Sequence, residues 1–168
     1  MGETERLKIP QADNVSKIQD VPLAIEDGFN TPERISLRYV FDRRQALYYL
    51  QAAQLLGLIV KRKSRYLLSG LGRQYVNLTP GKRKEIILRS MLSCSIIASI
   101  IIELFVSPSR SLTRERIVSI ASYRSGISGT TIERRVRSIL SWLTWIGEET
   151  GTLRVSKERV SLDASPRR

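Results

Sequence analysis

The stretch that most constrains the fold runs from Thr130 to Gly147 and reads TTIERRVRSILSWLTWIG. Its apolar residues recur in steps of three and four, so they fall on one side of an α-helix: Ile132, Val136, Ile139, Leu140, Leu143 and Ile146. The opposite side carries Thr131, Arg134, Arg135, Ser138, Ser141 and Trp142. The stretch therefore predicts an amphipathic helix whose apolar side packs against a core.

Both ends of this helix carry sequence signals. Thr130 is followed three residues later by Glu133, which is the spacing of a capping box. Gly147 stands where a helix can end in a left-handed residue. Arginines occupy the first two turns, where the helix macrodipole disfavours each cation by roughly 0.3–1 kcal/mol. This placement favours an external polyanion as their partner, and the alternative is that the arginines only solvate a surface helix.

The charge of the whole chain also points to a polyanion. Among 168 residues, 28 Lys and Arg stand against 16 Asp and Glu, which gives a net charge of +12. A charge this positive indicates DNA, RNA or an anionic membrane surface. The most apolar run, Ile96 to Val106, is too short to span a bilayer and is interrupted by Glu103. With no targeting segment and a single cysteine, we expect a cytoplasmic protein without a membrane partner.

The first half of the chain predicts three helices followed by a hairpin. Two short apolar runs flank the basic tip Lys61 to Arg65, as in a β-hairpin, and a short helix follows from Ser69 to Val76. Residues 1–12 are expected to be a leader that pairs as an edge strand through Leu7 and Ile9. The helix starts expected in this half are Asp13 or Asn14, Thr31-Pro32-Glu33, and Asp42.

The second half repeats this order, with helices beginning near Thr79, Cys94 and Thr113 and a hairpin from Thr152 to Leu162. Seven positions of the third helix match the 130–147 helix at a constant offset of ninety, and they are Arg44, Ala46, Tyr49, Leu50, Ala53, Leu56 and Gly57. The preceding helices match at an offset of eighty-two. We therefore expect the second copy to have eight extra residues in the turn between its two matched helices, in the sequence SYRSGISG.

The repeat predicts a mainly α fold with small β-hairpin wings, arranged as a tandem winged helix-turn-helix. We expect the first winged helix, with the leader, at residues 1–78 and the second at residues 79–162. Residues 163–168 are expected to form a basic tail.

Two stretches resemble a known group of proteins. SGTTIERRVRSILSWLTWIG, preceded by LLSGLGRQYVNLTPGKRKEII, looks like the winged-helix modules that accompany bacterial restriction–modification proteins. The resemblance covers residues 10–162 and consists of helical patterns. It implies that the chain reads or holds double-stranded DNA while a nuclease or methyltransferase partner performs the chemistry. That partner is either a separate subunit or another domain of a longer protein.

The residues expected to contact DNA lie on two recognition helices and a wing. Arg can form a bidentate pair with guanine and Gln with adenine. For each group the alternative is solvation of a surface. The first helix presents Arg43, Arg44, Gln45, Tyr48 and Gln51, and the second presents Thr131, Arg134, Arg135 and Ser138. Phosphate contacts are expected from Lys61, Arg62, Lys63 and Arg65, from Lys82, Arg83 and Lys84, and from Arg124.

Residue types argue against catalysis. The chain has no histidine, which excludes Ser-His and Cys-His nucleophile pairs, and one cysteine without histidine excludes an ordinary zinc site. The Glu-x-Lys element of many restriction nucleases and the glycine patterns of nucleotide-binding loops are also absent. We therefore expect no catalytic site, metal or cofactor, and we expect Glu148-Glu149 to solvate a turn rather than to bind magnesium.

Apolar residues leave a second function open. Trp142 and Trp145 are expected to pack rather than to stack on bases, and Cys94 is expected to be buried. The alternative to DNA reading is an interaction module, in which the second winged helix forms a homodimer or docks a partner, or a transcriptional regulator. The surface expected for that contact consists of Ile96, Ile97, Ile100, Ile101 and Leu104.

Overall fold

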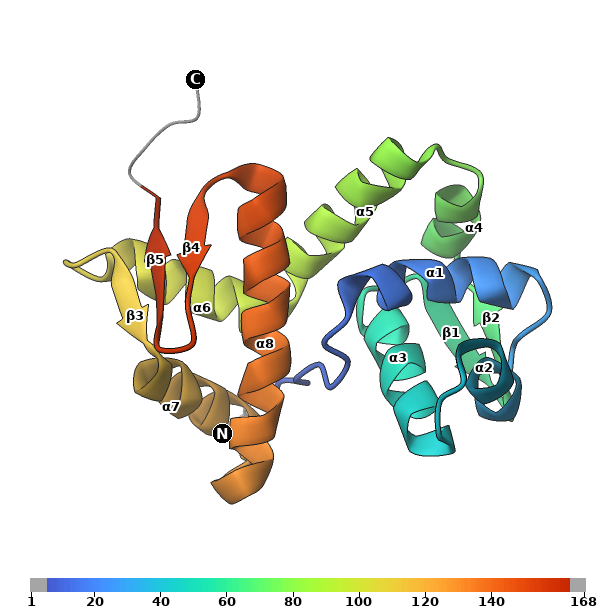
Figure 1. Ribbon diagram of the computed structural model, residues 1–168, viewed down its shortest axis with the longest axis horizontal. Coiled ribbons are helices and arrows are strands. Elements are labelled where there is room, and N and C mark those ends of the chain that lie inside the picture. The colour runs from blue at the N-terminus through green and yellow to red at the C-terminus, as the bar shows by residue number, and fades with distance from the viewer. Residues whose placement is uncertain (1–5, 164–168) are drawn as a thin grey trace, which may run out of the picture. The chain divides into compact units, whose positions relative to one another are not determined.

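The computed structural model describes residues 6–163 and is mainly helical, with two small antiparallel sheets (Figure 1). This confirms the helical fold class with small hairpins. The chain divides into two compact units, an N-terminal unit of residues 10–91 and a C-terminal unit that joins the segment before Pro10 to residues 92 onward. The division falls between Met91 and Leu92, near the end of a helix that begins at the expected junction after Thr79. All of the expected tail except Asp163 lies outside the described residues.

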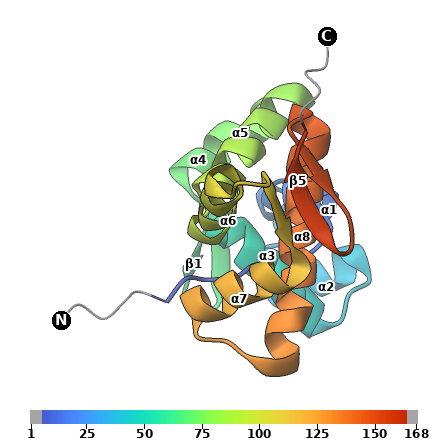
Figure 2. The same cartoon turned by 90° about the vertical axis from the view of Figure 1, so that its left-hand side faces the viewer.

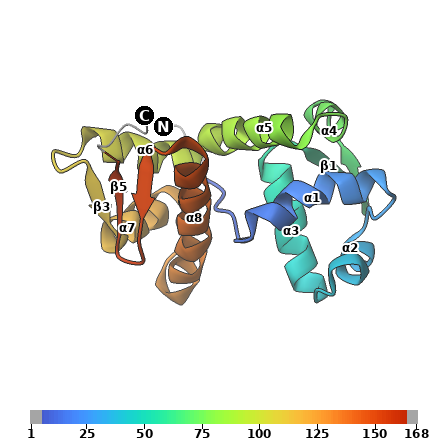
Figure 3. The ribbon, with the colours of Figure 1, turned by 45° about the horizontal axis from the view of Figure 1, so that its top comes forward.

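The N-terminal unit contains three helices, a hairpin and two further helices, as Figure 3 shows. Its elements are α1 (Val15–Glu26), α2 (Pro32–Tyr39), α3 (Arg43–Leu55), β1 (Ile59–Arg62), β2 (Arg65–Leu68), α4 (Gly70–Val76) and α5 (Pro80–Ser93). The expected caps are confirmed, because Asn14, Thr31 and Asp42 each accept a hydrogen bond from the backbone of the first turn. Asp42 also forms a complete capping box with Gln45. Helix α1 continues through Pro22, which does not divide it.

The hairpin of the N-terminal unit is tighter than the sequence predicts. Its strands pair from Ile59 with Leu68 to Arg62 with Arg65, so only Lys63 and Ser64 form the turn. The backbone N–H of Tyr66 donates to the carbonyl of Asn30 at 2.8 Å. This bond ties β2 to the link between α1 and α2, and the hairpin is therefore held against the helices.

The C-terminal unit contains a three-stranded sheet beside three helices (Figure 2). Its elements are α6 (Ser95–Val106), β3 (Ser111–Thr113), α7 (Arg114–Ser125), α8 (Gly129–Thr150), β4 (Leu153–Val155) and β5 (Arg159–Leu162). The expected hairpin is confirmed as β4 and β5, and the strand order is β3-β5-β4. Strand β3 is an addition to the expected fold, in which Leu112 pairs with Val160 and Thr113 both ends the strand and caps α7.

Helix α8 is longer at both ends than expected. It begins at Gly129, and Ser128 at its N-cap makes no side-chain capping bond, so the capping box expected from Thr130 and Glu133 is wrong. The helix passes through Gly147 and ends at Thr150, where Gly151 is left-handed with φ of 69°. A Cβ atom on Gly147 would lie 2.5 Å from the carbonyl oxygen of Leu153. The glycine therefore allows β4 to approach the helix rather than ending it.

The two consecutive helix pairs share one geometry. The link between α2 and α3 is residues 40–42, and the link between α7 and α8 is residues 126–128. Each link begins with a left-handed residue, Val40 with φ of 55° and Gly126 with φ of 70°. The eight extra residues of the second copy therefore lengthen the helices on both sides, and the expectation of a longer turn is wrong.

Three further expectations are corrected by the structure, one about a strand and two about burial. Residues 6–14 contain no strand, and Leu7 makes a single backbone hydrogen bond to the carbonyl of Arg124 at 3.0 Å. The apolar surface expected on α6 is instead largely core, because Ile96, Ile97, Ile100 and Leu104 are fully buried and Ile101 is half-buried. Ser138 was predicted to contact DNA from the side of α8 opposite its apolar residues, and it is buried.

Two expectations about apolar side chains agree with the structure. Trp142 is packed inside the C-terminal unit, as expected, and Trp145 is half-buried. Cys94 is buried and free, and this burial raises the pKa of its thiol.

Candidate nucleic-acid interface

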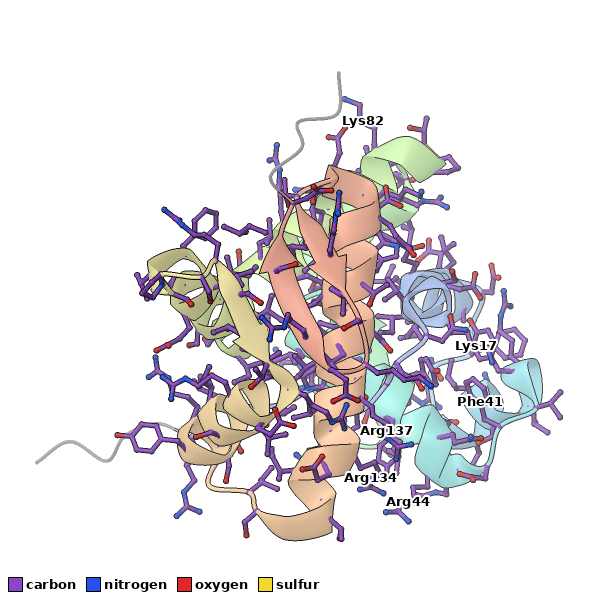
Figure 4. All side chains as sticks on the ribbon, turned by 60° about the vertical axis from the view of Figure 1, so that its left-hand side comes forward. Lys17, Phe41, Arg44, Lys82, Arg134 and Arg137 are labelled. Carbon is purple, nitrogen blue, oxygen red and sulfur yellow. The ribbon has the colours of Figure 1, made fainter. Side chains whose placement is uncertain are left out.

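The first half of α8 presents two arginines to solvent. Arg134 and Arg137 are exposed and lie three residues apart, and Figure 4 shows both leaving the same part of α8. Neither forms an ion pair within residues 6–163. Thr131 is exposed on the same turns, so this end of the helix offers a hydroxyl and two unpaired guanidinium groups to a ligand.

The other two residues expected on this surface lie differently. Arg135 is half-buried, and Ser138 is only 4% exposed, which removes it from any direct contact with DNA. Arg137 was not among the predicted contact residues. Its position three residues after Arg134 is the helical spacing that could have identified it.

An ion pair fixes the start of α8 against α7. The guanidinium of Arg114 lies 3.3 Å from the carboxylate of Glu133, and Arg114 is largely buried while Glu133 is about half exposed. The backbone N–H of Arg114 donates to the carbonyl of Glu158, next to β5, at 2.8 Å. Arg114 therefore connects α8 to the sheet, and this fixes the direction in which the exposed arginines point.

In the N-terminal unit, most of the residues predicted to contact DNA on α3 are already engaged. Arg43 lies 2.8 Å from the carboxylate of Glu33, and this hydrogen bond lowers the pKa of Glu33. Gln45 completes the capping box, and Gln51 accepts a hydrogen bond from the side chain of Gln11 at 3.4 Å. Arg44 contacts the hydroxyl of Tyr48. The predicted contact residues of α3 are all exposed except Tyr48, which is half-buried. To contact DNA, each of them would have to exchange its present partner on the protein surface for the DNA.

Aromatic stacking positions α3. Phe41, in the link before the helix, stacks on Tyr49 of α3 with ring centroids 4.9 Å apart, and on Tyr39 of α2 at 5.4 Å. The ammonium of Lys17, on α1, lies 4.5 Å from the centre of the Phe41 ring, and both residues are labelled in Figure 4. Three helices therefore meet at this ring, which fixes the start of α3.

The wing cations lie on two faces of the hairpin. Lys61 pairs across the strands with Tyr66, and its ammonium lies 5.9 Å from the centre of that ring. Because side chains alternate along a strand, Arg62 and Arg65 share the opposite face with the apolar pair Val60 and Leu67. Lys63 stands at the turn between them. The four cations are all exposed, and the structure brings Arg62, Lys63 and Arg65 together.

Of the remaining residues predicted to contact phosphate, one holds the backbone in place and the others are exposed. Arg83 donates to the carbonyls of Tyr75 and Val76, at 3.1 and 2.7 Å, and therefore holds the junction of α4 and α5. Lys82 and Lys84 are exposed on the first turns of α5, and Figure 4 labels Lys82. Arg124 is exposed at the end of α7, where its carbonyl accepts the bond from Leu7.

Two other kinds of feature, a metal-binding cluster and a membrane-spanning helix, can be examined in the described residues. Among residues 6–163, no three His, Cys, Asp or Glu side chains cluster in a way that could hold a metal ion. Within the same residues, no single helix has the length and apolarity to cross a membrane, and α5 and α6 reach that requirement only as a bent pair.

A family model matches residues 21–151, which include both helix pairs with their three-residue links. The chain belongs to the family described as Domain of unknown function (DUF7226). The match begins within α1 and ends at Gly151, so it covers α3, the wing of the N-terminal unit and all of α8. No curated protein and no solved structure matches the chain.

Proposed function

We propose that this DUF7226 chain is a tandem winged-helix module that binds double-stranded DNA, with α8 as its main recognition helix. The observation that carries the proposal is the pair of exposed arginines, Arg134 and Arg137, which form no ion pair within the described residues and lie on the first half of a helix that follows a three-residue link. In a helix-turn-helix, this part of the second helix enters the major groove.

The order of elements in the C-terminal unit supports the winged-helix part of the proposal. A helix, a short strand, two helices and a hairpin follow one another, and the short strand joins the hairpin in the order β3-β5-β4. The N-terminal unit has the same order, with a single backbone bond from Tyr66 to Asn30 in the place of the short strand. Both units thus place a hairpin immediately after the second helix of the pair.

Electrostatics supports a nucleic acid as the ligand. Arg134 and Arg137 lie in the second and third turns of α8, beyond the first turn where the helix dipole acts, so their support for an anionic ligand comes from their exposure without an ion-pair partner among the described residues. The net charge of +12 acts in the same direction, because it attracts the phosphate backbone at long range. A guanidinium on this part of the helix can pair bidentately with guanine or bind phosphate.

Because the chain resembles the modules that accompany restriction–modification proteins, we extend the proposal to a role in such a system. The chain would supply DNA recognition in the cytoplasm without catalysis of its own, while a nuclease or methyltransferase partner acts on the DNA. The exposed apolar side chains of α6 favour a second role in association, either as an interaction module or as a transcriptional regulator.

Alanine substitutions in α8 test the proposal. A DNA site is first obtained by binding-site selection, and Arg134→Ala and Arg137→Ala are then compared with the wild type on this site and on random DNA. Loss of a base contact should weaken binding to the selected site by roughly 1–3 kcal/mol, which is about 5- to 150-fold, and binding to random DNA by less. Fluorescence anisotropy measures both affinities, and circular dichroism checks the fold.

Arg89→Ala is the matched control, because Arg89 is an exposed arginine on α5, outside both candidate helices and the wing. It removes the same charge and should change both affinities only slightly. Equal losses on both DNAs for the α8 variants would mean that α8 contacts only phosphate, and Arg44 on α3 would become the candidate for base recognition. Unchanged binding in both α8 variants would refute the role of α8.

A further inference from the structure

Helix α6 exposes a continuous apolar face that the C-terminal unit does not cover. Ile102, Phe105 and Val106 are 62%, 54% and 70% exposed, although the other side of the same helix is fully buried. The face contains no charged side chain, because Glu103 is the only charge in α6 and it pairs with Arg116 at 3.0 Å. An exposed apolar cluster of this kind marks a contact with another molecule.

The size of the side chains changes along this face. The half near the start of the helix carries small residues, Ser95, Ala98 and Ser99, and the hydroxyl of Ser99 is turned back to the carbonyl of Ser95 at 2.8 Å. The half near its end carries the three large residues. Ser95, Ser99, Ile102 and Val106 follow the spacing of neighbours on one side of a helix.

We infer that this face binds a second copy of the chain through an antiparallel pairing of two α6 helices. A two-fold axis between Ser99 and Ile102 brings Val106 of each copy over Ser95 of the other and Ile102 over Ser99. Phe105 then lies beside Ala98. Large side chains thus meet small ones along the whole contact, which is the self-complementarity that a two-fold interface requires.

The geometry also sets the strength of this dimer. Because a 12-residue helix is only about 18 Å long, two such helices bury less than the roughly 800 Å² per partner of a stable complex. The dimer should therefore form in a concentration-dependent way. It would carry two copies of α8, so that DNA bound by a dimer has two half-sites.

Sedimentation equilibrium of the full chain over a wide range of concentration tests the dimer. The wild type should shift from monomer towards dimer as concentration rises, and Ile102→Asp should remain a monomer because the pairing would bury two carboxylates. Leu37→Asp is the matched control, since Leu37 is 80% exposed on α2. It should dimerise like the wild type. A wild type that stays monomeric, or an Ile102→Asp variant that dimerises normally, would overturn the inference.

Cysteine cross-linking tests the antiparallel direction. A mixture of Ser95→Cys and Val106→Cys chains should form a disulfide between the two variants. Val106→Cys alone should not, because the two Val106 positions lie at opposite ends of the contact, about 16 Å apart along the helix axis at a rise of about 1.5 Å for each of the 11 residues from 95 to 106. The buried Cys94 should stay reduced in the wild type under the same oxidation. Cross-linking of Val106→Cys with itself would contradict the antiparallel pairing.

Vesicle binding distinguishes a lipid surface from a second copy. A monomeric wild type that binds anionic vesicles, and an Ile102→Asp variant that does not, would assign the face to lipid and overturn the dimer. DNA binding by monomeric Ile102→Asp should persist on a single half-site, since the variant leaves Arg134 and Arg137 in place.

Discussion

Val40 and Gly126 occupy the same position in the two helix pairs, but they differ in how well they suit it. Both residues end the first helix of a pair in the left-handed region, with φ of 55° and 70°. Glycine adopts this conformation without steric conflict, whereas a β-branched residue brings its Cβ close to the backbone. Val40 is also 92% exposed, so its side chain gains little from packing. The N-terminal unit therefore contains strain that the C-terminal unit avoids.

Val40→Gly should relieve this strain and raise the free energy of unfolding by about 1 kcal/mol. Urea denaturation followed by circular dichroism measures the change. The opposite substitution, Gly126→Val, is the matched control and should destabilise the chain, because φ is positive and a Cβ there would lie 3.2 Å from the side chain of Arg6. A neutral or destabilising Val40→Gly would show that the left-handed residue is not strained.

At the scale of helices and strands, the sequence predicted the features whose signals are local. Asn14, Thr31, Asp42 and Thr113 each cap a helix whose first turn they precede directly, so pattern and structure agree there. Strand β3 has only three residues, and its partner Val160 is far away in the sequence, so no local pattern could show it.

The same limit applied to α8 and to the candidate site. The spacing of Thr130 and Glu133 suggested a cap, but Glu133 instead pairs with Arg114, a contact that only the tertiary structure creates. Arg134 was identified because helical periodicity places it opposite the core. Ser138 was misplaced because its burial depends on how α8 packs against neighbouring elements. Similarly, the engagement of Arg43 by Glu33 could not be foreseen from the exposed side of α3 alone.

The hairpin of β1 and β2 gives a prediction about phosphate binding by its turn. Lys63 stands at the two-residue turn, so Lys63→Ala should remove a phosphate contact and weaken binding to selected and random DNA by the same factor. The slope of log affinity against log salt should fall by about 0.9, as expected for one phosphate contact. Anisotropy titrations at several salt concentrations measure this slope. A loss confined to the selected DNA would instead assign base recognition to the wing.

At the scale of the whole molecule, charge dominates the expected behaviour. The excess of 12 positive charges is carried by arginines and lysines on both units, and several of them, including Arg38, Arg43, Arg114 and Arg116, are neutralised by neighbouring carboxylates. The cations without such partners remain available to an external polyanion. Binding should therefore combine a general attraction to DNA with a smaller contribution from a few oriented side chains.

Affinity for duplex DNA should therefore fall steeply with salt, because phosphate neutralisation releases condensed counterions. If the two units together contact six to ten phosphates, affinity should decrease on the order of 10³- to 10⁵-fold between 50 and 200 mM salt. The measurement is a titration of labelled duplex at constant pH over this range. A flat response, or no binding at low salt, would refute a nucleic-acid role.

The division of α8 into an exposed start and a buried remainder has a consequence for how such a chain can diversify. From Ile139 to Gly147 the helix is largely enclosed by its own unit, and Gly147 cannot gain a side chain without displacing Leu153. Thr131, Arg134 and Arg137 meet no such restriction. Exchange of these three residues should therefore alter the preferred DNA site while leaving stability almost unchanged, so related chains could acquire new targets through few substitutions.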